Sequence, residues 1–93
     1  MARYKLSEDA QSDLKRIYAH GIIGFGIKKA DKYFDALYEQ FELITKTPYL
    51  FQEVHHIMPG IRRSVCGVDS IYYLIDEGVV EILMIKGRQE VSF

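Results

Sequence analysis

The sequence of 93 residues has no long hydrophobic run. Its longest unbroken apolar stretch, Ile71 to Ile75, is five residues long, whereas a helix that crosses a bilayer needs about 20. The charged start, Arg3 to Lys5, does not lead into the apolar segment of a secretory signal peptide either. We therefore expect a protein that neither spans a membrane nor is secreted.

Cysteine is nearly absent, and an excess of basic residues is missing. Cys66 is the single cysteine, so no disulfide can form within the chain, in agreement with a cytoplasmic location. The 12 Lys and Arg residues are balanced by 13 Asp and Glu residues, for a net charge of −1. Domains that bind nucleic acid through its phosphates usually carry a clear basic surplus. We expect a cytoplasmic protein with no direct nucleic-acid partner.

What the sequence does contain is typical of a folded domain. Hydrophobic residues make up 48% and charged residues 27%, far from the composition of disordered chains. A chain of this length buries about 60 to 65% of its unfolded surface around one core. Residues 1–93 are therefore expected to form a single domain.

The first half has helical periodicity. Alternation over Arg3 to Leu6 predicts a short strand, and Ser7, followed by two acids, predicts a helix N-cap. We expect this helix to end near Gly21, because the segment Gly21 to Gly26 contains three glycines. A second helix, closed by Pro48, is indicated by an apolar stripe at helical spacing: Ala30, Phe34, Leu37, Phe41 and Ile44. Together they predict an antiparallel helical hairpin.

The second half has the periodicity of strands. Three strands are predicted after Pro59-Gly60: Ile61 to Cys66, Ile71 to Asp76 and Val79 to Lys86. A two-residue loop at Glu77-Gly78 sets the pairing of the last two strands. The pairs expected on one wholly apolar face are Ile75 with Val80, Tyr73 with Ile82 and Ile71 with Met84. The fold class is therefore α+β, an N-terminal strand and a helical hairpin packed on one face of an antiparallel β-sheet.

The opposite face of the sheet is not polar, as a solvated face would be. Tyr72, Leu74 and Leu83 are expected to form an exposed apolar patch there, a typical mark of a partner site. Coverage by the tail after Gly87, or by the segment Tyr49 to Met58, is the alternative.

Four basic groups accompany this sheet. With Ile61 and Val65 pointing to the core, Arg62 shares the outer face with Leu74 and Glu81. The sequence leaves two roles for Arg62: an ion pair with Glu81 or a contact with a partner protein. Partner contact is favoured for Lys86 and Arg88 at the exit of the last strand. The candidate partner-binding residues are Arg62, Tyr72, Leu74, Leu83, Lys86 and Arg88.

Several short motifs occur in a characteristic order over more than 80 residues. They are Leu6-Ser7, Asp13-Leu14, Phe25-Gly26, Tyr33, Leu37, Phe41, Pro48, Pro59-Gly60-Ile61-Arg62, Tyr72-Tyr73, Val80-Glu81-Ile82-Leu83 and Gly87-Arg88. In this order they resemble the ParE branch of the ParE/RelE toxin superfamily of bacterial toxin–antitoxin systems. Many relatives have His-Gly-Arg where this chain has Lys86-Gly87-Arg88, in a region that matters to toxicity in the family.

The resemblance implies a toxin that inhibits DNA gyrase, and so DNA replication, without being an enzyme. It implies a hetero-oligomer with a ParD-like antitoxin, which lays a helix and an extended segment across the toxin. No cofactor is expected. Adjacent His55 and His56 do not complete a recognisable metal-ligand spacing, so no metal site is expected either.

The RelE branch, whose members cleave messenger RNA on the ribosome, is the alternative. Such cleavage needs a base, an acid and cations around the phosphate. Arg62, Arg63, Lys86 and Arg88 supply cations. The ionisable Tyr or His that RelE-like enzymes place near the C-terminus is replaced here by Phe93, so we expect no catalytic residues.

Overall fold

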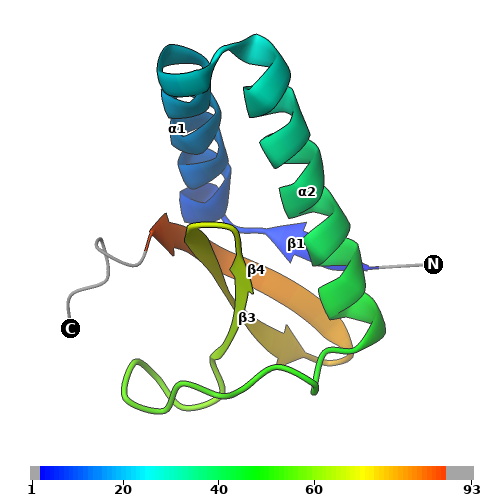
Figure 1. Cartoon of the computed structure of the whole chain (residues 1–93). Coiled ribbons are helices and arrows are strands. Elements are labelled where there is room, and N and C mark those ends of the chain that lie inside the picture. The colour runs from blue at the N-terminus through cyan, green and yellow to red at the C-terminus, as the bar shows by residue number, and fades with distance from the viewer. Residues whose placement is uncertain (1–2, 88–93) are drawn as a thin grey trace.

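The structure, a computed structural model, describes residues 3–87. Two long helices form a hairpin that stands on one side of a four-stranded sheet (Figure 1). The elements are β1 (Tyr4–Leu6), α1 (Glu8–Phe25), α2 (Ile27–Lys46), β2 (Arg62–Cys66), β3 (Asp69–Asp76) and β4 (Val79–Gly87). Within residues 3–87, neither helix is apolar enough over a sufficient length to cross a bilayer.

The sheet has the strand order β1-β4-β3-β2. β2, β3 and β4 are antiparallel, as expected, whereas β1 pairs parallel to β4. The α+β fold class is confirmed, but the sheet is mixed and not antiparallel throughout. β1 and β4 are far apart in the sequence, so no tight turn dictates the direction of their pairing.

The helical hairpin differs from expectation at its glycines. Ser7 caps α1 as predicted, with its Oγ accepting from the backbone N–H of Ala10 at 3.0 Å. The prediction that the helix ends near Gly21 is wrong, because α1 continues to Phe25. A Cβ at Gly21 would lie 3.2 Å from the Cβ of Ala30, so this glycine allows the two helices to approach closely. Gly26, with φ of 90°, is the single residue between them.

The helices cover one face of the sheet and enclose the main core. The stripe of α2 is confirmed, since Ala30, Leu37, Phe41 and Ile44 are buried, while Phe34 is half-buried. The sheet residues in the same cluster are Ile71, Tyr73, Val80, Ile82 and Ile85. Full burial of each large apolar side chain contributes about 1.5–3 kcal/mol, so this layer is the main source of stability.

A β-bulge changes the predicted pairing of β3 with β4. Tyr73 lies opposite Ile82 as expected, but the register shifts between Tyr72 and Tyr73. Ile71 therefore pairs with Ile85 and not with Met84. An extra residue in one strand moves the following side chains to the other face, which places Met84 away from the helices. A regular alternation cannot reveal such an insertion.

Helix α1 replaces a missing strand along one edge of β4. β1 reaches only from Val80 to Ile82 of β4. Beyond it, Ser7 Oγ donates to the carbonyl of Leu83 at 2.6 Å. The carboxylate of Asp13 accepts from the N–H of Ile85 at 2.9 Å, and Arg16 donates to the Ile85 carbonyl at 3.2 Å. Side chains of the α1 segment thus satisfy backbone groups that an open edge would expose.

Tyr73 gives the fold a specific response to alkaline pH. Its side chain is fully buried, and its hydroxyl donates to the Pro48 carbonyl at 2.7 Å. Burial raises the pKa of Tyr73 to about 12 from 10.0, although the positive charge of Arg62 opposes the change. From pH 10 to pH 12 the unfolded chain releases this proton while the folded chain keeps it, so the stabilising contribution, complete below pH 10, is lost as the pH rises.

We therefore expect the free energy of unfolding to fall over this range, and to fall less steeply in Tyr73→Phe. Urea titrations between pH 9 and 11.5 would measure both slopes. Parallel slopes for the two proteins would contradict the assignment to Tyr73.

Candidate functional site

The outer face of the sheet is largely closed by the chain itself. Tyr72 was expected in an exposed patch, but its side chain is only 1% exposed, so that expectation is wrong. It packs with Val54 and Ile61 in a second apolar cluster, and the long segment between α2 and β2 passes on this side of the sheet (Figure 1). Leu74 and Leu83 are half-buried. Coverage by this segment is therefore the correct alternative.

Arg62 lies on the face opposite to the one predicted. It pairs in register with Tyr73 and therefore points to the helix side of the sheet, whereas Leu74 points away. Its guanidinium donates to the carbonyl of Phe51 at 2.6 Å and lies 3.4 Å from a carboxylate oxygen of Glu53. The ion pair with Glu81, one of the two alternatives for Arg62, is thus replaced by contacts with the segment after α2.

The remaining two candidates are Lys86, near the end of β4, and Arg88. Lys86 is part of an internal network, because its Nζ lies 2.9 Å from Oδ1 of buried Asp13. About one third of the Lys86 side chain stays exposed. Arg88 lies outside the described residues. Partner contact by Lys86 and Arg88 remains a prediction.

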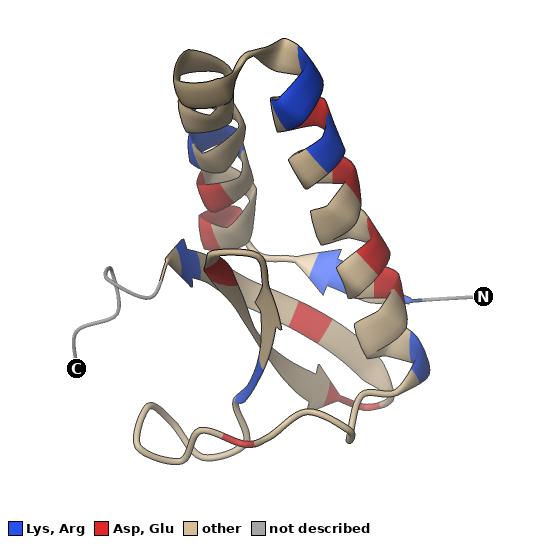
Figure 2. Cartoon of the chain, viewed as in Figure 1, with Lys and Arg blue, Asp and Glu red and all other residues tan. Residues whose placement is uncertain are grey.

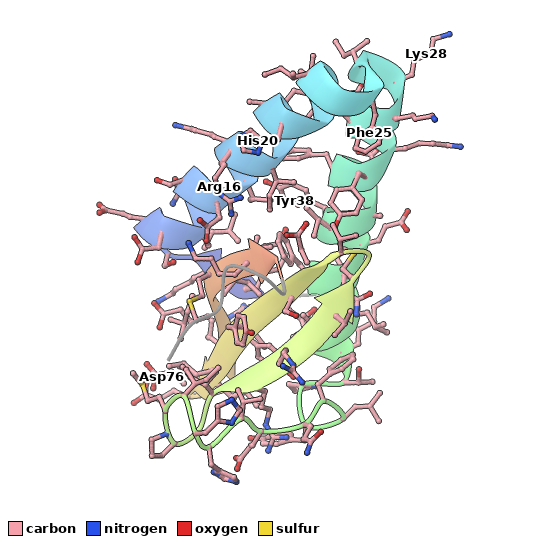
Figure 3. All side chains as sticks on the ribbon, turned by 60° about the vertical axis from the view of Figure 1, so that its left-hand side comes forward. Arg16, His20, Phe25, Lys28, Tyr38 and Asp76 are labelled. Carbon is pink, nitrogen blue, oxygen red and sulfur yellow. The ribbon has the colours of Figure 1, made fainter. Side chains whose placement is uncertain are left out.

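The structure contains a cleft that the sequence analysis did not anticipate. It has a volume of about 800 Å³ and opens between the helical hairpin, the β2–β3 turn and the end of β4. Arg16 and His20, from successive turns of α1, lie along it, and Phe25 lies near its upper end (Figure 3). The lining residues are Arg16, Ile17, His20, Gly21, Phe25, Lys29, Ala30, Tyr33, Gly67, Val68, Asp69 and Gly87.

The cleft combines apolar surface with basic groups. Its apolar lining includes Ile17 and Ala30, which are buried, and Val68, which is 74% exposed. Arg16, His20 and Lys29 come from both helices and surround this apolar surface. An amphipathic segment with acidic side chains beside an apolar stripe would match this arrangement. The residues are distant in sequence, so only the tertiary structure brings them together.

One wall of the cleft is held by Tyr33. Its hydroxyl lies 2.7 Å from Oδ2 of Asp69 and 2.9 Å from the carbonyl of Cys66. Burial, followed by the hydrogen bond to Asp69, raises the pKa of Tyr33 well above its ordinary value. Burial also raises the pKa of the Cys66 thiol. Both groups are therefore protonated near neutral pH, so neither supplies an ionised base or nucleophile.

The two adjacent histidines lie away from the cleft. His55 is exposed, and its Nε2 lies 3.0 Å from Oε2 of Glu53. His56 is exposed as well. Within residues 3–87, no three His, Cys, Asp or Glu side chains come together in a way that would hold a metal ion. His55 thus makes a surface contact with a neighbouring carboxylate.

Comparisons of the sequence with known proteins point to one family of toxins. Residues 4–91 match the model of a family described as the ParE toxin of the type II toxin–antitoxin system parDE. The chain is 30% identical to Toxin ParE1 of Caulobacter vibrioides over 91% of its own length and 88% of that protein. It is 25% identical to Toxin ParE1 of Mycobacterium tuberculosis over 90% of its length and 87% of that protein.

Solved structures with the same fold include toxin–antitoxin systems. A chain of the chromosomal ParDE system from P. aeruginosa superimposes with a TM-score of 0.81 at 24% identity, over 94% of this chain and 96% of that one. A chain of the RelBE2 complex from Mycobacterium tuberculosis gives a TM-score of 0.69 at 17% identity, over 94% and 98%. At these identities the likeness establishes the fold alone.

Proposed function

Since the chain belongs to the ParE toxin family of type II toxin–antitoxin systems, we propose that it inhibits DNA gyrase by binding and is neutralised by a ParD-like antitoxin. The observation that carries a binding mode of action is the cleft, where apolar surface and basic side chains converge. Inhibition by binding needs a shaped surface and no reacting groups.

The antitoxin is proposed to occupy this cleft. An amphipathic helix would bury its apolar side on Ile17, Ala30 and Val68. Acidic side chains on its flanks would face Lys29 and His20. The solved relatives support such a partner, because they come from systems named ParDE and RelBE2. The complex would be a hetero-oligomer of toxin and antitoxin.

The action on gyrase is tested with purified protein. We expect the chain to block the supercoiling of relaxed plasmid by gyrase, and an equimolar amount of the cognate antitoxin to restore it. The measurement is the fraction of supercoiled plasmid on a gel as the toxin concentration rises. Full supercoiling at saturating toxin would rule out gyrase as the target.

Cleavage of messenger RNA is the competing activity of the superfamily. A translation reaction with a defined message, incubated with the same sample, is expected to yield no toxin-dependent cleavage products. Products cut at particular codons on the ribosome would replace the binding mechanism with the RelE-like one.

A further inference from the structure

The tip of the helical hairpin exposes large apolar side chains. Ile22, Ile23, Phe25 and Ile27 are 37%, 84%, 73% and 58% exposed. They lie around the junction at Gly26, where α1 ends and α2 begins. Single exposed apolar residues are common, but a group of this size on a monomer often marks an interaction site. We call Ile22, Ile23, Phe25 and Ile27 the hairpin tip.

The described part of this chain does not cover the hairpin tip. Both helices project beyond the sheet, and their junction is at the far end of the molecule from the segment that follows α2 (Figure 1). That segment covers Tyr72 on the opposite side of the sheet.

Basic residues accompany the hairpin tip in an arrangement that costs helix stability. Lys28 and Lys29 lie in the first turn of α2 and Lys32 in the next, and all three are exposed (Figure 2). The positive end of the helix dipole disfavours cations at these positions. Gly26 provides no side-chain cap, and the first turn of α2 contains no acid.

Helix α1 shows the favourable arrangement within the same chain. It begins with Ser7 as a capping side chain and with Glu8 and Asp9 in its first turn. The start of α2 therefore breaks a rule that the start of α1 obeys. Such local conflicts are expected where a surface serves a function.

We propose that the hairpin tip is the surface with which this toxin enters an apolar pocket bordered by acidic side chains on its protein target. The proposal rests on the proposed function, because it assigns the surface that acts on the target. A convex group of apolar side chains fits a concave pocket, and the lysines beside it match an acidic border.

The same observations disfavour two other occupants. A standard interface buries about 800 Å² per partner, which four side chains do not supply, so the hairpin tip does not by itself hold two copies together. An interfacial membrane helix lies in the plane of the membrane with its apolar face buried, whereas here two helices present only their ends. A protein pocket accommodates such an end.

The hairpin tip also meets the cleft proposed for the antitoxin. Phe25 and Lys29 belong to the cleft lining, whereas Ile23 and Ile27 do not. An antitoxin seated in the cleft would therefore cover one side of the hairpin tip and exclude the target. This overlap gives neutralisation a direct steric basis.

The test replaces Ile23 and Ile27, the two most exposed of the three tip residues that lie outside the cleft. The double variant Ile23→Gln with Ile27→Gln keeps the fold, because both side chains are exposed and glutamine favours helices. Leu50→Gln is the matched control, since Leu50 is 72% exposed on the segment after α2. The measurements are growth after induction without antitoxin, the concentration for half-inhibition of gyrase, and the Kd for the cognate antitoxin.

For the double variant we expect inhibition of growth and of gyrase to weaken at least about 30-fold, as for loss of an interface anchor. Leu50→Gln should inhibit like the wild type. The antitoxin Kd should change less than about threefold in both, which also reports that the variants are folded.

Inhibition by the double variant at the wild-type level would overturn the proposal. So would an equally large loss of antitoxin affinity, which would make the hairpin tip an antitoxin contact. If the wild type binds vesicles of anionic phospholipid and the double variant does not, the hairpin tip is a membrane-binding surface instead. If the wild type arrests growth without inhibiting gyrase, the proposed target is wrong while the growth comparison still decides the role of the hairpin tip. A wild-type chain that leaves growth unimpaired would overturn both proposals.

Discussion

Replacement of Asp13 by alanine is expected to lower the free energy of unfolding by about 2 to 4 kcal/mol. Asp13 is 5% exposed, and its carboxylate accepts from the N–H of Ile85 and from Lys86, each at 2.9 Å. Arg16 lies 3.5 Å from the same carboxylate. Alanine would leave a buried N–H without its acceptor and would remove the carboxylate that faces Lys86 and Arg16. Urea unfolding at neutral pH would measure the change.

Asp13→Asn is the matched control. The asparagine oxygen can still accept from the N–H of Ile85, but the charge that faces Lys86 and Arg16 is removed. We expect a loss about half as large as in Asp13→Ala. Equal losses in the two variants would show that charge, and not the satisfied N–H, dominates. A loss under about 0.5 kcal/mol in Asp13→Ala would contradict the structural role of this contact.

Gly67→Ala is expected to cost about 2 to 4 kcal/mol and to distort the cleft. Gly67 has φ of 60°, in the left-handed region that alanine adopts only with strain of about 1 kcal/mol. A Cβ there would lie 2.5 Å from Cε1 and 2.8 Å from the hydroxyl of Tyr33. Tyr33 would have to move and would lose its hydrogen bond to Asp69. Urea unfolding and antitoxin affinity would both report the change.

Gly78→Ala separates backbone strain from the steric clash. Gly78 has φ of 78°, yet a Cβ there would meet nothing within 4 Å. This variant should lose only about 1 kcal/mol and keep wild-type affinity for the antitoxin. If the free energy of unfolding falls equally in both glycine variants, the close approach of Gly67 and Tyr33 does not contribute to the cost of Gly67→Ala.

The sequence by itself determined the elements that local periodicity encodes. The apolar stripe of α2 predicts the residues that line the core, because residues three and four positions apart share one face of a helix. The Ser7 cap and the short loop between β3 and β4 are likewise local in sequence. The order of motifs over the whole chain was enough to indicate the toxin family.

Only the tertiary structure shows how these elements pack against one another and complete one another's hydrogen bonds. The glycines at the hairpin predict a break when only backbone freedom is considered, whereas Gly21 serves the close contact with Ala30. The bulge that turns Met84 to the outer face adds a residue to one strand and leaves no mark on the composition. Tyr72 appeared available to a partner because sequence does not show that Val54 and Ile61 fold over it.

The feature that depends most on the tertiary structure is the edge of β4. Asp13 and Ile85 lie 72 positions apart, yet the carboxylate of Asp13 accepts the hydrogen bond of the Ile85 backbone N–H. The cleft is likewise assembled from α1, α2, the β2–β3 turn and the end of β4. Periodicity reports only which residues share a face of their own element. Which faces meet is decided by packing, so the sequence alone specified a small toxin-like α+β domain, and the fold specified the surfaces through which it acts.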